Sequence, residues 1–318
     1  MRWPAALAIV AGCGGAAGGD PTDAPTASDA AVDAPAFALR ATVTRAGTGP
    51  LTLATNLPAR AAACAALPEV GAPCADVDGD GLTDAWEDLA LDRLRPLMRF
   101  DEDEQLIGDA GAVLRQLGRV TPRAGADLDV VAIIVLAYSL DYGSCGGFTG
   151  HHGDSERVAL RLGTPAGGGP GDVEVVAAFT TGHEGTSNDQ SRIFAGADRA
   201  QLVTAPDPQR GEPRWVVYPS ADKHATYATI ALCEGVSVVP CFDEDCAPDG
   251  VADPAGYDRL PPIANVGEPG RRRVDDLAPL GFPGDSAWGA GEFCGGLGGT
   301  GCSSGLLGKF TADPFAGM

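Results

Sequence analysis

The chain has 318 residues, of which 44% are hydrophobic, enough to bury one large core or two small ones. It carries 43 acidic and 22 basic residues, a net charge of −21. Nucleic-acid phosphates need a basic surface, so the sequence predicts no nucleic-acid partner. The same excess of carboxylates suits a divalent cation such as Ca²⁺. The oligomeric state stays open.

Residues 1–13 have the layout of an export signal, with one positive charge, a short apolar run and small residues before Cys13. Residues 10–13 resemble the lipobox of bacterial lipoproteins. The resemblance implies cleavage before Cys13 and acylation of that cysteine, which would anchor an exported protein to a membrane of the bacterial cell envelope. An ordinary secretory signal is the alternative. Residues 14–35 are almost all small or polar and predict a flexible tether.

Residues 36–97 predict a β-hairpin followed by a calcium loop and a helix. Strand-like alternation from Phe37 to Leu57 is broken by a Gly- and Pro-containing turn at 46–50. Leucines and Trp86 form an apolar stripe that predicts a helix ending near Pro96. Upstream, Pro68 and Pro73 exclude a regular helix entering the loop.

The twelve residues from Asp76 to Glu87 match the EF-hand calcium loop, with acids at positions 1, 3, 5, 9 and 12 and glycine at position 6. The predicted ligands are Asp76, Asp78, Asp80, the carbonyl of Leu82, Asp84 and Glu87. Without an entering helix, the segment resembles the single calcium loops of dockerin-like and thrombospondin type 3 segments. The alternative is a solvated acidic turn.

Residues 98–318 predict a domain of short strands. Residues 128–138 are almost continuously apolar, and later strand-like runs are separated by turns rich in Gly, Pro, Asp and Asn. This rhythm favours an antiparallel β-sandwich over alternating β and α units. The predicted fold class is therefore mainly β, an antiparallel β-sandwich with a short N-terminal calcium-loop helix module.

Nine cysteines, less a lipidated Cys13, leave eight, an even number that suits four disulfides in an oxidising compartment. Eight cysteines allow 105 connectivities. Short separations favour three pairs and leave a fourth by elimination. The predicted pairs are Cys64–Cys74, Cys241–Cys246, Cys294–Cys302 and Cys145–Cys233.

Histidines and acids gather in two short runs, residues 149–156 and 220–227. Asp154 and Glu156 are two residues apart, so on a strand they share one face. His183 and His224 are the candidates for a general base near neutral pH. The alternative for each histidine is an ordinary hydrogen-bonded side chain at the end of a strand.

Residues 150–156, Gly-His-His-Gly-Asp-Ser-Glu, resemble the G-H-R-H-D-W-E heptapeptide of the necrosis-inducing, Nep1-like secreted proteins. They also resemble the H-x-G-D-W-E run of the vacuolar protein sorting sixty-two family. Residues 95–104 are similar to the opening P-x-x-x-F-x-x-x-E segment of the latter family, and residues 218–227 to its S-x-x-K-H-A-x-Y strand. Residues 265–268 and 281–284 fit its closing region.

The resemblance implies a β-sandwich that holds a second divalent cation. Carboxylate ligands suit Ca²⁺ or Mg²⁺, and a histidine ligand shifts the preference towards Mn²⁺ or Zn²⁺. The ligands that the resemblance implies are Asp141, His151, Asp154 and Glu156. A hairpin turned at residues 143–147 would bring the two strands that carry them together. Gly153 and Ser155 depart from the motif, so membrane-damaging activity is not implied. The alternative is a hydrogen-bonded polar network without a metal.

These features predict an exported, lipid-anchored envelope protein that binds calcium and presents a surface to a glycan, lipid or peptide. One alternative is a metal-dependent hydrolase with His183 or His224 as base. Another is a purely structural envelope protein. An open cleft with a coordination position free for water would favour the hydrolase.

Overall fold

The computed structural model describes residues 37–45, 47–67, 71–109, 112, 114–125, 128–143, 150–185, 189–234, 244–246, 263–267, 292–295 and 301–318. The predicted signal, Cys13 and the tether lie outside these residues. So do the side chains of His151 and His152, although their backbone is described.

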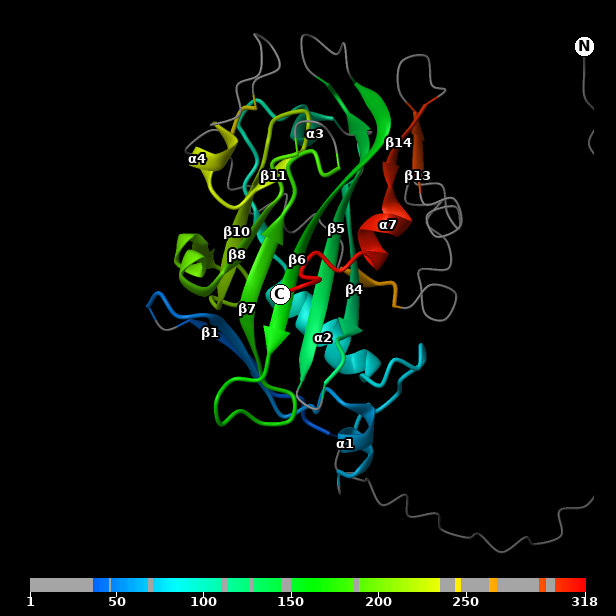
Figure 1. Cartoon of the computed structure of the whole chain (residues 1–318), viewed down its shortest axis with the longest axis vertical. Helices are drawn as coiled ribbons and strands as arrows, with labels where there is room; N and C mark the ends of the chain where they lie inside the picture. Colours follow the sequence, from blue (N-terminus) through cyan, green and yellow to red (C-terminus); the bar gives the residue numbers. More distant parts are fainter. Residues whose placement is uncertain are drawn as a thin grey trace, which may run out of the picture. The chain divides into compact units, whose positions relative to one another are not determined.

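The largest sheet has eight strands in the order β1-β2-β7-β6-β5-β4-β12, with β8 also paired to β7 (Figure 1). Its strands are β1 (Ala41–Arg45), β2 (Leu51–Thr55), β4 (Leu114–Pro122), β5 (Asp129–Asp141), β6 (His151–Gly163), β7 (Val173–Thr180), β8 (Arg192–Ala195) and β12 (Ala264–Asn265). The predicted hairpin is confirmed as β1 and β2. It is not a separate layer, because β2 pairs with β7.

Two smaller sheets accompany it, one centred on β10 and one formed by β13 and β14. Their strands are β3 (Leu97–Met98), β9 (Thr204–Pro206), β10 (Pro213–Pro219), β11 (Thr226–Tyr227), β13 (Glu292–Gly295) and β14 (Gly301–Gly305). The helices are α1 (Ala61–Ala65), α2 (Asp84–Leu94), α3 (Gln105–Gly108), α4 (Ile230–Cys233) and α7 (Leu306–Thr311), with a 3-10 turn η1 (Gly196–Gln201). No helix among the described residues is long and apolar enough to cross a membrane.

The prediction of a mainly β protein is confirmed, but the sheets are mixed. Most neighbouring strands are antiparallel, whereas β12 pairs parallel to β4 and β3 pairs parallel to β10. Parallel partners require a crossover connection, and these partners lie far apart in the chain. Strand-like runs and turn residues predict neighbouring hairpins, and they carry no information about such distant pairings.

Strand β5 explains the long apolar run, because both of its faces are buried. Val130, Ala132 and Ile134 belong to one hydrophobic core, and Val131 and Ile133 to another. The first core also contains side chains of α2 and β10, and the second contains Phe310 and Phe315 of the C-terminal residues. A strand covered on both faces loses the alternation of polar and apolar residues.

Helix α2 forms where the sequence predicts it. Thr83 caps its N-terminus by accepting a hydrogen bond from the backbone of Trp86. Acidic residues in the first turn interact favourably with the positive end of the helix dipole. The helix ends at Leu94. Arg95 then takes an extended conformation, because it precedes Pro96.

The predicted disulfide Cys64–Cys74 is confirmed. The second described disulfide joins Cys233 to Cys246, with Cα atoms 6.1 Å apart, so the predicted pairs Cys145–Cys233 and Cys241–Cys246 are wrong. Short sequence separation was a poor guide there, because packing brings residue 246 beside α4 and β10.

Cys145 and Cys241 lie outside the described residues. Cys294 and Cys302 are paired in the β13–β14 register, but the structure does not describe their side chains, so the predicted disulfide between them stays a prediction. The two described disulfides are typical of a protein in an oxidising, exported compartment.

Candidate functional site

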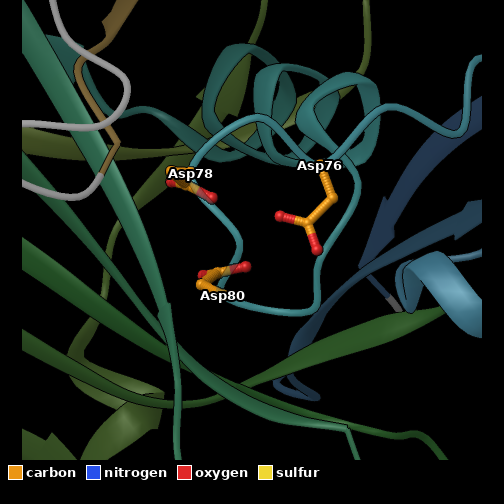
Figure 2. A group of neighbouring side chains, drawn as sticks. All are labelled: Asp76, Asp78 and Asp80. Carbon is orange, nitrogen blue, oxygen red and sulfur yellow. The ribbon is translucent and has the colours of Figure 1, made fainter.

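The predicted calcium loop brings its carboxylates together. Figure 2 shows Asp76, Asp78 and Asp80 turned toward one another on the loop before α2, and their oxygens lie within 4.8 Å of one another. A second group of the same compactness contains Asp78, Asp84 and Glu87. Since Asp78 belongs to both groups, the five predicted acidic ligands form one connected cluster.

Local hydrogen bonds give the loop its shape. The two carboxylate oxygens of Asp76 accept hydrogen bonds from the backbone of Gly79 (2.7 Å) and Gly81 (3.1 Å), and Asp80 accepts one from the backbone of Leu82 (2.7 Å). Gly81, at position 6, has φ +93°, where a side chain would be strained. The sequence therefore encodes the sharp turn that a calcium loop needs.

Burial makes this cluster chemically significant. The exposed fractions of Asp78 and Glu87 are 1% and 0%. Buried carboxylates that crowd one another are costly unless an opposite charge compensates them. A set of ligands made only of oxygens suits a hard cation. Ca²⁺ tolerates variation in the number and arrangement of its oxygen ligands, so it suits a loop of this kind.

The loop is attached to the rest of the fold at several points. The indole nitrogen of buried Trp86 donates to the carbonyl of Gly171, between β6 and β7, at 2.9 Å. Leu82 is fully buried and forms a β-bridge with Arg60, just before α1. The disulfide at Cys74 closes the segment that leads into the loop. Filling the loop with a cation would therefore stabilise more than the loop itself.

A second polar cluster lies at the other end of the large sheet, around His224. This side chain is fully buried, and its ring stacks on Tyr138 of β5, with 3.8 Å between centroids and 3° between planes. Its Nδ1 lies 3.5 Å from Oδ2 of Asp154 in β6, and its Nε2 lies 3.5 Å from Oε1 of Glu104, the residue that caps α3. The imidazole thus bridges two carboxylates.

The positive charge of His224 and the negative charges of its two carboxylate partners stabilise one another. Burial opposes protonation of His224, but the interactions with Asp154 and Glu104 outweigh it and raise the pKa of His224 to about 10. Burial alone would raise the pKa of Glu104, yet the interaction with His224 leaves that pKa below its usual value. A histidine that stays protonated at neutral pH is a poor general base.

Glu156, two residues along β6, has different neighbours. Thr181 donates a hydrogen bond to its Oε2 at 2.5 Å, and Nζ of Lys309 in α7 lies 4.0 Å from the same oxygen. Burial raises the pKa of Glu156 to about 7, Lys309 opposes that rise, and the negative charge of Asp154 adds to it.

The predicted pairing of the two strands is confirmed, and it places the four residues of the expected second cation site on adjacent strands. Most of the predicted turn at 143–147 lies outside the described residues. In the β5–β6 register Asp141 faces His151, whereas Asp154 faces Tyr138. Asp141 accepts a 2.5 Å hydrogen bond from the backbone of Gly143. Among the side chains that the structure describes, Asp141, Asp154 and Glu156 do not form a compact group of potential metal ligands. The side chain of His151 lies outside the description.

His183, the other predicted base, belongs to a third polar group. Its Nε2 lies 2.7 Å from Oε1 of Glu244, and Nζ of Lys223 lies 3.6 Å from the same oxygen. The hydrogen bond to Glu244 raises the pKa of His183, and burial opposes the rise. His183 is therefore hydrogen-bonded to a buried carboxylate.

Sequence reasoning missed several members of these clusters. The missed residues are Glu104, Tyr138, Thr181, Glu244 and Lys309. Glu104 could have been predicted from the sequence, because it is the final glutamate of the P-x-x-x-F-x-x-x-E segment. Lys309 had a weaker signal, as a lone basic residue among apolar ones near the C-terminus.

No family model, curated protein or solved structure matches this chain. The resemblance to the necrosis-inducing and vacuolar protein sorting sixty-two families therefore stays a prediction from short motifs. Three of those motifs do meet in the fold, because Glu104, Asp154 and His224 come from the three separate segments.

Proposed function

We propose that this chain is an exported envelope protein that binds one Ca²⁺ in the loop from Asp76 to Glu87, where the ion acts as a structural staple. The convergence of five acidic side chains, two of them almost fully buried, carries this proposal. The attachments of Leu82 and Trp86 to α1 and to the β6–β7 connection support the structural role.

The direct test is calcium-dependent unfolding of the full chain. A ligand bound only by the folded state adds about 2.7 kcal/mol at a hundredfold excess over its Kd. Thermal unfolding in EDTA and in millimolar Ca²⁺ should therefore differ for the native chain and not for Asp76→Ala/Glu87→Ala.

Asp88→Ala/Glu102→Ala removes the same number of carboxylates from exposed positions and is the matched control, which should retain the calcium effect. A calcium effect that survives in Asp76→Ala/Glu87→Ala would place the ion elsewhere.

We also propose that the protein is held at the membrane by a lipid on Cys13. The lipobox-like residues 10–13 and the disulfides of an exported protein support this anchor. Cys13→Ser should move the protein from the membrane fraction to the soluble fraction. Continued membrane association of that variant would contradict the anchor.

We propose that the large sheet and the β10 sheet form the two layers of a sandwich that presents a glycan, lipid or peptide surface. Support for the layers comes from the shared core, in which Trp215 and Val217 of β10 join Ile134 of β5. Glycan and lipid arrays probed with the full chain would test the surface, and the absence of any ligand would favour the purely structural alternative.

The metal-dependent hydrolase receives less support. His224, one of its two candidate bases, is fully buried and held protonated, so it is not prepared to accept a proton from water.

A further inference from the structure

The C-terminal residues 306–318 are bound to the large sheet by a set of arginines. Arg119 of β4 donates to the carbonyl of Phe310 at 2.8 Å. Arg157 of β6 donates to the carbonyls of Lys309 (2.8 Å) and Ala312 (2.7 Å). Cationic donors suit these carbonyls, because they lie at the negative end of α7. We call residues 306–318 the C-terminal strap.

Buried aromatic residues complete the attachment of the strap. Phe310 and Phe315 have exposed fractions of 2% and 0%, and both belong to the core on the second face of the sheet. Arg123 donates to the carbonyl of Phe315 at 3.3 Å and pairs with Asp313 at 3.4 Å. The strap is therefore seated by charge-assisted hydrogen bonds and by apolar burial at two separate points.

This seating delivers one ammonium group to β6. Nζ of Lys309 donates to the carbonyl of Ser155 and lies 4.0 Å from Oε2 of Glu156. On the same strand, Oδ2 of Asp154 lies 3.5 Å from Nδ1 of His224. Of the three acids that the family resemblance assigns to a cation, Asp154 and Glu156 thus each face a basic side chain of the protein itself.

We propose that Lys309 and His224 take the place of a divalent cation at Asp154 and Glu156, with the C-terminal strap as the device that carries Lys309 there. A divalent ion between these acids would meet two like charges in a buried setting, where repulsion is poorly screened. Nor does Asp141 complete a ligand set. Tyr138 is the strand partner of Asp154, and Asp141 follows Tyr138 by three residues. Three residues of a β-strand span about 10 Å, so Asp141 is displaced from Asp154 by about that distance along the strand.

A double-mutant cycle on the full chain tests the role of Lys309. Lys309→Met keeps the length of the side chain but leaves the buried Glu156 without its cation, so at pH 8 in EDTA it should lower the midpoint of thermal unfolding by about 5 °C or more. Adding Glu156→Gln should restore most of that loss, because the uncompensated carboxylate is then gone. Strictly additive losses would overturn the proposal.

Metal stoichiometry gives a second test that does not depend on the stability of Lys309→Met. Native protein and Glu156→Gln should bind equal amounts of Ca²⁺, Mg²⁺ and Mn²⁺ in calorimetric titrations. One equivalent lost in Glu156→Gln would show that the pair does hold a divalent cation and would overturn the proposal. Asp76→Ala/Glu87→Ala, measured in parallel, reports on the calcium loop alone, so the failure of one proposal is distinguishable from failure of the other.

Discussion

Two acidic clusters of this protein are arranged in opposite ways. In the loop from Asp76 to Glu87, carboxylates converge on one another, and backbone amides hold them in place. Around β6, carboxylates are separated, and Asp154 and Glu156 face basic side chains from distant segments. The number of acids therefore does not show whether they converge into a candidate cation site. The decisive difference is whether the fold supplies its own positive charge.

The largest effect should come from removing the central cation of the β6 cluster. His224→Gln leaves Glu104 and Asp154 buried without their shared partner, so it should cost about 3–5 kcal/mol in urea unfolding at pH 7. Arg210→Gln is the control, because its ion pair with Asp92 is about one-third exposed (32% and 31%) and should contribute less than about 1 kcal/mol. Equal losses in the two variants would contradict a buried, mutually dependent cluster.

The same histidine predicts a pH dependence. Its pKa is raised from 6.5 to about 10 in the folded protein, so the folded state binds this proton more tightly than the unfolded state. The resulting stability is complete below about pH 6.5 and is lost as the pH rises through about 10. Urea unfolding between these pH values should show a falling free energy for the native protein and a flatter profile for His224→Gln.

The disulfide beside the calcium loop should have the next largest effect. Cys64 and Cys74 are separated by 10 residues, and a closed loop of that length contributes about 2–3 kcal/mol in the chain-entropy model. Thermal unfolding of Cys64→Ser/Cys74→Ser in EDTA should show this loss relative to the native protein. No loss would mean that the calcium loop is ordered without the cross-link.

Single ligands of the calcium loop should affect affinity more than folding. Asp78 belongs to both sets of converging acids in the loop, and Asp78→Asn removes its negative charge. We expect the Kd for Ca²⁺ to rise at least about tenfold, equivalent to about 1.4 kcal/mol. Calorimetric titration measures this, with Asp88→Asn on the exposed side of α2 as the control. Similar Kd values for the two variants would contradict Asp78 as a ligand.

The smallest predicted effect separates the helix from the ion. Thr83 caps α2 through its hydroxyl, and loss of such a cap costs about 1 kcal/mol. Thr83→Ala should lower the unfolding free energy by that amount in EDTA and in Ca²⁺ alike. A loss seen only in Ca²⁺ would show that the hydroxyl acts through the calcium loop instead.

Local pattern was enough to predict the parts of this protein whose partners are close in the chain. The hairpin of β1 and β2, the turn at Gly81, the end of α2 before Pro96 and the disulfide Cys64–Cys74 all depend on contacts within about a dozen residues. The pairing of β5 with β6 belongs to the same class at the end where Asp141 faces His151, since these residues are ten apart in the chain. Steric and hydrogen-bonding preferences of single residues dominate at that range.

Distant partners were beyond the reach of sequence pattern. Glu104 and Asp154 meet at His224, and Lys309 reaches Glu156 from the far end of the chain. Each of these contacts depends on how the sheets and the C-terminal strap pack, and composition and periodicity do not encode that arrangement.

By itself, the sequence determined that the chain is mainly β and that the acids of residues 76–87 gather in one loop. Only the tertiary structure decided that the acids of β6 are compensated by protein cations instead of converging on one another. The physical reason is the separation along the chain of the residues that interact. A calcium loop is written in twelve consecutive residues, whereas the charge balance of a buried carboxylate depends on every segment packed around it.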